Sequence, residues 1–396
     1  MMQKRGLGDA ALRGRRVLVR VDYNVPQDAS GHIADDRRIQ ESLPTLNHLR
    51  AGGARTILMS HLGRPGGTRD PRYSLKPVAR RLSSILGQPV PVAEDIVGIQ
   101  ALELSTRIEN GGFLMLENLR FHPGEEANDP TFAAQLARLG ELFVEDAFGV
   151  VHRAHASTVG VPQRIPAVAG LLVEREIREL SRLLDRPDRP YTVLLGGAKV
   201  ADKLPLLTSF CGRADTLLLG GALVFPFLTA DGAKLGATKV EAGLDDAVGR
   251  LRAVAAEKGT ILVLPSDLVV ERPGVAQPEV YALDAIPADG IARDIGPATR
   301  ATFRDHLERS RTVFWNGPLG LAEDPRFAGG TRDVLGALAT IVGYHVAAGG
   351  DSARTAQDLG VLNGFEFVST GGGAALEFVQ GLELPGLAVL PNAQPG

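Results

Sequence analysis

Residues 192–203 read TVLLGGAKVADK, and this stretch decides the fold class. It opens on the uncharged run Thr192–Leu195, which has the length and apolar character typical of a buried strand. Two glycines follow, and a glycine pair lets the backbone turn tightly or approach a ligand closely. Lys199 and Lys203 lie four residues apart, which places them on one face of a helix. The stretch therefore predicts a strand, a glycine loop and a helix, the repeating unit of a parallel sheet.

The same plan recurs along the chain, where short apolar runs alternate with longer amphipathic segments. Helical segments are predicted at Arg38–Ala51, Leu75–Leu86 and Pro130–Leu139. The run Val90–Ala93 contains Pro91, which favours an edge strand because proline cannot donate to a neighbouring strand. The other predicted strands are Val17–Val21, Thr56–Met59, Phe113–Leu116, Leu142–Val144, Thr216–Leu219, Ile261–Leu264, Thr312–Trp315, His345–Ala348 and Phe365–Val368. This alternation predicts an α/β fold with mostly parallel sheets flanked by helices.

Chain length and one proline-rich segment predict two domains. At 396 residues the chain exceeds the size of one ordinary hydrophobic core. A charged helical stretch around Leu171–Leu184 is followed by Asp-Arg-Pro-Asp-Arg-Pro at 185–190, which indicates a stiff link. We therefore predict an N-terminal domain over residues 1–170, a helical connector over 171–190 and a C-terminal domain over 191–383.

Composition argues against several classes of protein. The net charge of -3 gives no reason to expect a nucleic-acid binder or a protein that binds anionic membranes. Cys211 is the single cysteine, so no intramolecular disulfide can form, which fits a reducing compartment. The apolar stretch Thr216–Ala230 is too short to span a bilayer, and the first 16 residues contain no apolar signal segment. We therefore expect a soluble, cytoplasmic protein.

The loops after the predicted strands share one edge of each sheet, where ligands bind in open parallel sheets. In the first half these loops are rich in arginine and histidine, whose donors match phosphate and carboxylate oxygens. In the second half they are rich in glycine, and Lys199, Lys203 and Asp351 accompany them. Glycine amides can bind phosphate, and a carboxylate can bind Mg²⁺. This contrast predicts two anionic substrates, a nucleoside triphosphate and a small acceptor, and hence phosphoryl transfer.

Each of these signals also has a structural explanation. A Gly-Gly pair can serve tight packing alone, and Asp351 can cap the helix that follows it. Glu323 lies in a predicted loop, where a surface carboxylate is ordinary. His152 and His155 have a spacing suited to zinc, but no cysteine and no HExxH pattern supports a metal cluster there. The sequence lacks GxxxxGK[ST] and lacks GxGxxG after its first strand, which argues against a P-loop enzyme and a dinucleotide dehydrogenase.

From about Arg15 to its C-terminal end the chain resembles the phosphoglycerate kinase family. The resemblance rests on segments that occur in the family's order and spacing: RVLVRVDYNVP, SHLGRPGG, LENLRFHPGEE, EDAFGVVHRAHASTVG, LLGGAKVADK, DIGPAT, FWNGPLG, GGDS and STGGGAALEF. It implies two Rossmann-like domains joined by a helical hinge, with residues 384–396 returning to the N-terminal domain. It also implies reversible, Mg²⁺-dependent phosphoryl transfer between ATP and the carboxylate of 3-phosphoglycerate, in glycolysis or gluconeogenesis, by a hinge-bending monomer.

The resemblance assigns roles to residues at matching positions. 3-Phosphoglycerate would bind Asp22, Asn24, Arg38, His61, Arg64, Arg120 and Arg153. The nucleotide would bind Gly196, Ala198, Lys199, Lys203, Gly221, Gly296, Asn316, Pro318, Glu323, Gly349, Gly350, Asp351 and Ser352. Glu323 is expected on the ribose and Asp351 on the Mg²⁺. We predict that Arg38 and Lys199 bind the transferred phosphoryl group, assisted by backbone amides of Gly371 and Gly372.

The sequence departs from the family's pattern at four positions. Tyr23 stands where phenylalanine is common, Ala322 replaces a usual aromatic residue, Ala348 stands where a third glycine often precedes Gly-Asp, and Pro226 falls in a segment that usually lacks proline. None of these changes removes a group that the reaction requires. Two alternatives stay open: a catalytically silent homologue that binds nucleotide or phosphoglycerate, and a different nucleotide-dependent enzyme on the same two-domain plan.

Overall fold

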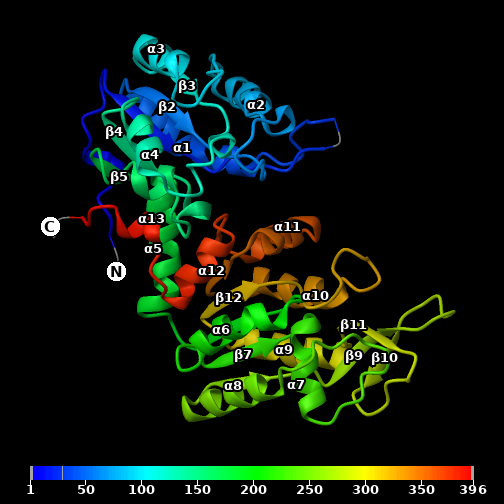
Figure 1. The fold of residues 1–396 in the computed structure, drawn as a ribbon. Coiled ribbons are helices and arrows are strands. Elements are labelled where there is room, and N and C mark those ends of the chain that lie inside the picture. Colours follow the sequence, from blue (N-terminus) through cyan, green and yellow to red (C-terminus); the bar gives the residue numbers. More distant parts are fainter. Residues whose placement is uncertain (1–2, 29, 394–396) are drawn as a thin grey trace. The chain divides into compact units, whose positions relative to one another are not determined.

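The computed structural model describes residues 3–28 and 30–393. The chain divides into two compact units, one formed by Met1–Ser181 with Glu383–Gly396 and the other by Arg182–Leu382 (Figure 1). Each unit is built on a parallel sheet flanked by helices, so the predicted α/β fold class is confirmed. The division between the units falls inside helix α5 (Leu171–Asp185).

The first unit contains a five-stranded parallel sheet of order β3-β2-β1-β4-β5. Its strands are β1 (Arg16–Arg20), β2 (Arg55–Met59), β3 (Phe113–Met115), β4 (Leu142–Glu145) and β5 (Ala167–Ala169). Strand β1 is central and pairs with both β2 and β4, so the chain's crossovers reverse direction beside it. In open α/β sheets this reversal leaves a crevice at the carboxyl ends of the strands, where ligands bind.

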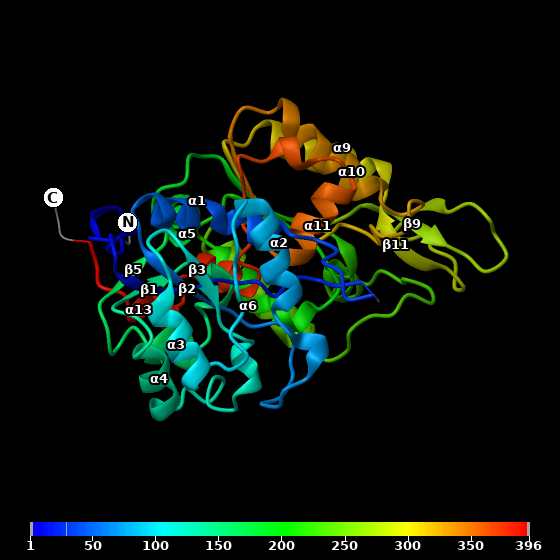
Figure 2. The ribbon, with the colours of Figure 1, turned by 90° about the horizontal axis from the view of Figure 1, so that it is seen from above.

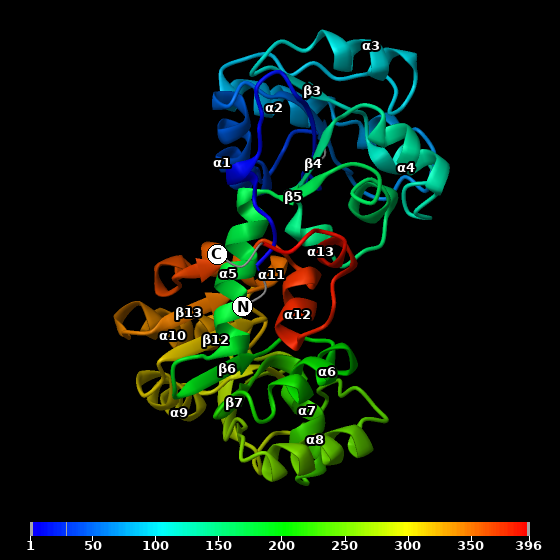
Figure 3. The same ribbon diagram turned by 90° about the vertical axis from the view of Figure 1, so that its left-hand side faces the viewer.

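Helices α1 (Arg37–Ala51) and α2 (Lys76–Leu86) cover one face of this sheet, because their apolar side chains form one core cluster with strand residues. The unit also contains α3 (Ile99–Arg107) and α4 (Pro130–Ala137), and α4 lies across the sheet from α1 (Figure 3). Two details of the strand prediction were wrong. Val90–Ala93 makes only an isolated bridge, from Val92 to Met115, and the short strand β5 was missed.

The second unit contains a six-stranded parallel sheet of order β14-β13-β12-β6-β7-β8. Its strands are β6 (Tyr191–Leu195), β7 (Thr216–Leu219), β8 (Ile261–Val263), β12 (Thr312–Asn316), β13 (Tyr344–Ala347) and β14 (Phe367–Val368). Helices α9 (Pro297–Glu308), α10 (Gly329–Ala337) and α11 (Gly350–Asp358) contribute to a core around the buried Trp315. Across the sheet lie α6 (Val200–Phe210), α7 (Phe225–Ala230), α8 (Asp245–Glu257) and α12 (Gly373–Gln380) (Figure 3).

The second unit also carries a small antiparallel sheet that the sequence analysis missed. It consists of β9 (Asp267–Glu271), β10 (Glu279–Ala282) and β11 (Ile291–Ile295), seen at the right of Figure 2. The outer strand β10 is largely exposed, so it has no continuous apolar run that would identify it as a strand.

The C-terminal segment packs on the first unit through α13 (Pro385–Ala388). The amide of Gly386 donates to the carbonyl of Val151 at 2.8 Å, and Asn392 forms an antiparallel bridge with Lys4. The last three residues of the predicted returning segment, 394–396, lie outside the described residues. Across the described ranges, no helix combines the length and apolar character needed to cross a bilayer.

Candidate active site

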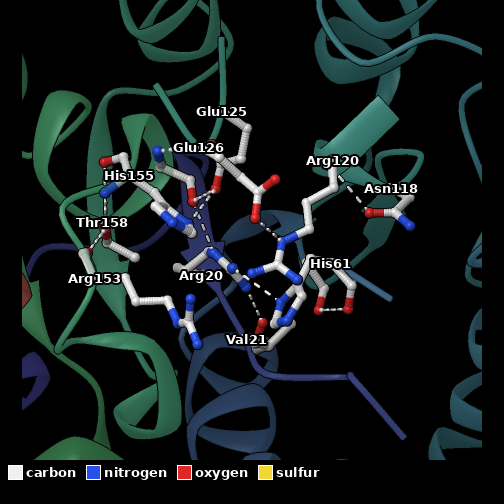
Figure 4. Close-up of polar contacts among 12 residues, drawn as sticks. Arg20, Val21, His61, Asn118, Arg120, Glu125, Glu126, Arg153, His155 and Thr158 are labelled. Carbon is white, nitrogen blue, oxygen red and sulfur yellow. Dashed lines mark hydrogen bonds and ion pairs between the residues drawn. The ribbon is translucent and has the colours of Figure 1, made fainter. Parts of the chain in front are cut away.

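Loops at the carboxyl ends of four strands hold the residues predicted to bind the acceptor in the first unit. Asp22 and Asn24 follow β1, and His61 and Arg64 follow β2. Arg120 lies in the turn Leu119–Phe121 after β3, Arg153 follows β4, and Arg38 lies in the first turn of α1. Figure 4 shows Arg120 and Arg153 on either side of His61 and the buried Arg20. The parallel sheet therefore gathers these side chains at one edge.

Arg38 is held by a buried carboxylate. Its Nη1 atom donates to Oδ2 of Asp22 at 2.6 Å, and the Asp22 side chain is only 10% exposed. Burial acts to raise the pKa of Asp22, but the positive charges of Arg38 and Arg20 outweigh it and the pKa is lowered. Asp22 is therefore ionised at neutral pH and orients Arg38 with part of the guanidinium left for a ligand.

The loop after β2 is fixed from two sides. The amide of Gly63 donates to Oδ1 of Asn24 at 2.9 Å, and Nη1 of Arg120 donates to the carbonyl of Gly63 at 2.8 Å. Gly63 has a φ of 61°, and a Cβ there would lie 2.3 Å from the Tyr73 ring, so only glycine fits. The neighbouring Arg64 is exposed and has no hydrogen bond or ion pair within the described ranges.

Arg20 determines which hydrogen-bonding form His61 adopts. Arg20 is 1% exposed, and its Nη2 atom lies 3.2 Å from Nδ1 of His61. A guanidinium can only donate, so Nδ1 of His61 must accept and the ring proton must lie on Nε2. Burial, reinforced by the charge of Arg20, lowers the pKa of His61 well below its usual value. His61 is therefore a neutral donor through Nε2 at physiological pH.

Arg20 is also connected, through Ser157, to the buried carboxyl group of Glu125. Nε of Arg20 donates to Ser157 Oγ at 2.8 Å, and Ser157 Oγ donates to Glu125 Oε1 at 2.6 Å (Figure 4). Burial raises the pKa of Glu125, against the opposing charge of Arg20. Neither charged residue was predicted as part of the site. The signal for Arg20 was present, because a charge inside the apolar run VLVRV has to find a buried partner.

The zinc alternative for His152 and His155 has no structural support. Within the described ranges no group of three or more His, Cys, Asp or Glu side chains could hold a metal ion. His155 is buried, and burial together with the charge of Arg20 lowers its pKa to about 4. His155 therefore belongs to the same polar network as Arg20, since its Nδ1 atom lies 3.8 Å from Oε1 of Glu125.

In the second unit, glycine loops follow five strands of the large sheet at its carboxyl edge. Gly196, Ala198 and Lys199 follow β6, and Gly221 follows β7. Asn316 and Pro318 lie at the end of β12, Gly349–Ser352 follow β13, and Gly371 and Gly372 follow β14. A Cβ on Gly196 would lie 2.0 Å from the carbonyl oxygen of Pro318, so these loops pack backbone against backbone. Some of the predicted glycines therefore also serve close packing.

Lys203 joins two of these loops. Its Nζ atom donates to Oδ1 of Asn316 at 2.7 Å and to the carbonyl of Gly196. Burial lowers the pKa of Lys203 to about 8, although the charge of Asp351 opposes this. Lys199, by contrast, is exposed and has no partner among the described residues. The two lysines that the sequence analysis grouped together therefore differ in environment.

Helix N-termini are available to an anion at only some of the predicted loops. At the start of α6 the amides of Val200 and Ala201 donate to the carboxylate of Glu241, and at α9 the amides of Ala298 and Thr299 donate to Asp267. Gly296 therefore abuts a helix start that is already capped. No motif in the sequence indicated the role of Glu241.

Helices α11 and α12 start differently. They begin after Gly349 and Gly372, which have positive φ angles of 103° and 54° and carry no side chain that could cap the helix. An approaching phosphate would find the partial positive charge of both helix ends. Asp351, in the first turn of α11, and Glu323, after β12, are both exposed.

Comparison with known proteins assigns the family. The family model described as "Phosphoglycerate kinase" matches residues 7–382. The chain belongs to the phosphoglycerate kinase family. It is 48% identical to the phosphoglycerate kinase of Rubrobacter xylanophilus, over 99% of this chain and 100% of that protein, and 47% identical to that of Desulforudis audaxviator, with the same coverage.

Solved structures agree with this family assignment. The structure of phosphoglycerate kinase from Coxiella burnetii matches with a TM-score of 0.89 and 36% identity, over 98% of both chains. The phosphoglycerate kinase from Pyrococcus horikoshii matches with a TM-score of 0.86 and 33% identity, over 97% of this chain and 98% of that one. The predicted membership of the phosphoglycerate kinase family, a family of kinases, is confirmed. The roles of individual site residues remain predictions.

Proposed function

We propose that the protein catalyses the reversible transfer of a phosphoryl group between ATP and the carboxylate of 3-phosphoglycerate, in glycolysis or gluconeogenesis. The observation that carries the proposal is the excess of positive charge at the sheet edge of the first unit. Arg38 is oriented by Asp22, while Arg64 and Arg153 are exposed and unpaired within the described ranges. A small ligand with both a phosphate and a carboxylate satisfies such a set of guanidinium groups.

The acceptor needs no general base. A carboxylate is already ionised at neutral pH, so its oxygen can attack phosphorus directly. The neutral His61 supports this assignment, because it can donate through Nε2 to an anionic oxygen without taking up a proton. Arg20 and Asp22 hold the donors in place before the ligand arrives, which reduces the reorganisation needed on binding.

The nucleotide half of the site is proposed for the second unit. Lys203, held by Asn316, and the exposed Lys199 supply positive charge, and α11 and α12 supply helix N-termini for phosphate oxygens. Glu323 is exposed and can accept hydrogen bonds from ribose hydroxyls. A Cβ on Gly196 or Gly221 would clash with the neighbouring backbone of Gly197 or Pro318, so these glycines allow the close packing of the loops on which a nucleoside would lie.

Asp351 fits a role in holding Mg²⁺. Mg²⁺ in nucleotide sites is usually bound by one or two carboxylates together with phosphate oxygens and water, rather than by a cage of protein ligands. Asp351 offers one exposed carboxylate in the first turn of α11, close enough to Lys203 to influence its pKa. When bound, Mg²⁺ would neutralise charge on the nucleotide phosphates.

During transfer, the protein's task is to neutralise charge on the moving phosphoryl group and to hold the reacting oxygens in line. We assign this to Arg38, Lys199 and the backbone amides of Gly371 and Gly372. Because the acceptor residues and the nucleotide residues belong to different units, we propose that bending at α5 completes the arrangement and excludes water. A monomeric state and a cytoplasmic location are part of the same proposal.

A coupled assay tests the proposed function. ADP formation from Mg-ATP is measured with and without 3-phosphoglycerate, for the wild type, for Lys199→Ala and for Lys258→Ala, an exposed lysine at the C-terminal end of α8. We expect turnover that requires the acceptor, is abolished by Lys199→Ala and is retained by Lys258→Ala. Saturable nucleotide binding without acceptor-dependent turnover would instead favour the silent homologue, which no feature of the structure favours.

A further inference from the structure

The first turn of α1, which carries Arg38, lacks one of the backbone hydrogen bonds that a regular helix would give it. Pro44 lies inside α1 and has no N–H group, so the carbonyl of Gln40 loses its usual helical donor. The N-cap residue Asp36 also makes no side-chain capping hydrogen bond. The turn keeps other anchors, since the amides of Ile39 and Gln40 donate to the carbonyl of Asp36 and the amide of Arg37 donates to Oδ1 of Asp35. Contacts from outside the helix add to these and limit how far the turn can shift.

Such a contact comes from the hydroxyl of Tyr23. Its oxygen lies 2.8 Å from Oγ of Ser42, and Ser42 Oγ donates to the carbonyl of Ile39 at 2.8 Å. Serine has one hydroxyl proton, and here it is used on Ile39, so Tyr23 must donate to Ser42. Tyr23, Ser42 and Ile39 are each at most 1% exposed, so water does not compete for these bonds.

The hydrogen bonds of the Tyr23 and Ser42 hydroxyls connect the same two segments as the Asp22–Arg38 ion pair. Tyr23 directly follows Asp22, and Ile39 directly follows Arg38. The backbone of Tyr23 is itself anchored, because its amide donates to Ser60 Oγ at 2.9 Å. Residues 22 and 23 therefore hold residues 38 and 39 at two points: a salt bridge between side chains, and a hydroxyl chain that reaches the backbone.

We propose that Tyr23, acting through Ser42, is a positioning residue that fixes the first turn of α1 and thereby the guanidinium of Arg38. The proposal rests on the function proposed above, since Arg38 is assigned there to the transferred phosphoryl group. Tyr23 does not contact the ligand in this account. Phenylalanine at position 23 would fill the same volume but would break the hydrogen bond from the loop after β1 to Ser42. The Arg38–Asp22 salt bridge would then be the remaining polar link from that loop to α1 among the described residues.

The kinetic test uses Tyr23→Phe, with Tyr281→Phe as its matched control. The Tyr281 hydroxyl donates to Oε2 of Glu279 on the exposed strand β10 of the second unit. We expect Tyr23→Phe to lower kcat about three- to tenfold, the effect of losing one hydrogen bond, with KM for ATP unchanged. In an Arg38→Ala background the same substitution should lower kcat no further. A drop of equal size in both backgrounds would overturn the proposal.

A stability measurement separates positioning from plain support of the fold. Ser42→Ala leaves the buried Tyr23 hydroxyl without an acceptor, so its Tm should fall below that of Tyr23→Phe, by about 2–4 °C. The double variant Tyr23→Phe/Ser42→Ala removes both polar groups and should recover part of this loss. If Tyr23→Phe lowers Tm but leaves kcat unchanged, the pair serves stability only and the proposal is wrong.

A third measurement does not depend on turnover. Arg38 lowers the pKa of Asp22, so loosening Arg38 should raise that pKa, which carboxyl NMR titration can follow in wild type and Tyr23→Phe. An unchanged pKa of Asp22 would show that the hydroxyl does not hold the Arg38–Asp22 pair. If the wild type showed no turnover but this pKa rose in Tyr23→Phe, the proposed function would fail while the positioning role would stand.

Discussion

The Nη1 atom of Arg38 lies 2.6 Å from Oδ2 of Asp22, and the two residues come from different elements that meet at the carboxyl end of the central strand. One element is the first turn of α1 and the other is the loop after β1. Asp22 occupies one edge of the guanidinium and leaves its other donors without a partner in the described part of the chain. A cation that is oriented but only partly satisfied is well suited to binding a charge that develops during a reaction.

Replacing Arg38 tests this role. Arg38→Ala should lower kcat by about 10²- to 10³-fold, because a cation aimed at the transition state is lost, and should weaken 3-phosphoglycerate binding much less. Arg37→Ala is the control, since the neighbouring Arg37 pairs with Asp35 instead. Steady-state kinetics with both substrates varied measures the effect. A large rise in KM with kcat intact would show that Arg38 acts only in ground-state binding.

The proton position inferred for His61 predicts a difference between two amide substitutions. The side-chain amide of glutamine reaches the position of Nε2, whereas that of asparagine reaches only the position of Nδ1. His61→Gln should therefore retain much of the affinity for 3-phosphoglycerate, while His61→Asn should weaken it about tenfold or more. Calorimetric titration compares the two variants. Equal losses would indicate that the Nε2 donor does not face the ligand.

The lowered pKa of Lys203 predicts that nucleotide binding depends on pH. With a folded-state pKa of about 8, Lys203 loses its charge as the pH rises through 8, so ADP affinity should fall between pH 7 and pH 9. Lys203→Arg keeps its charge throughout this range and should flatten the pH profile even if its affinity is lower. A wild-type affinity that stays constant over this range would contradict the assignment.

The lowered pKa of Lys203 should weaken nucleotide binding at high pH, but it should increase the stability of the folded state there. The folded state releases the Lys203 proton at a lower pH than the unfolded chain, whose lysines titrate near 10.5. The contribution of this group to the free energy of unfolding therefore increases as the pH rises from about 8 to about 10.5. Urea unfolding of wild type and Lys203→Met across this range measures the difference.

The carboxylate of Asp351 predicts a specific effect on the use of Mg²⁺. Asp351→Asn should remove most of the gain in ADP affinity that Mg²⁺ provides, because one of its few protein ligands is lost. Binding of metal-free ADP should be unchanged or slightly tighter, since a negative charge near the phosphates is gone. Glu323→Gln is the control and should keep the Mg²⁺ gain. If both variants lose the gain equally, Asp351 is not the Mg²⁺ ligand.

Much of the fold could be predicted from local sequence. Runs such as Val17–Val21 and Thr216–Leu219 are short, apolar and bounded by loop residues, and each became a buried parallel strand. The antiparallel sheet β9–β11 was missed, because its pairing joins residues up to 27 positions apart and its outer strand is exposed. Val90–Ala93 was wrongly predicted as a strand, because an apolar run alone does not say whether a neighbouring strand is present.

In the candidate site, too, some features could be predicted from local sequence and others could not. Asp22, Arg38, Lys199 and Lys203 could be identified from residue type and from their place after a strand or in a helix. The partners of these residues could not. Arg20 meets His61 across 41 positions, and Glu241 reaches the amide of Val200 across the same separation. No local pattern specifies either contact, because each depends on which loops the folded sheet brings side by side.

The sequence alone therefore determined the strand–loop–helix plan, the family and the residue types at the sheet edge. These features follow from hydrophobic periodicity and loop motifs, which depend only on residues close together in the sequence. Only the tertiary structure decided which nitrogen of His61 carries the proton, which helix ends are already capped and how Tyr23 reaches the backbone beside Arg38. These properties are set by distances of about 3 Å between groups far apart in the chain, and such distances exist only once the chain has folded.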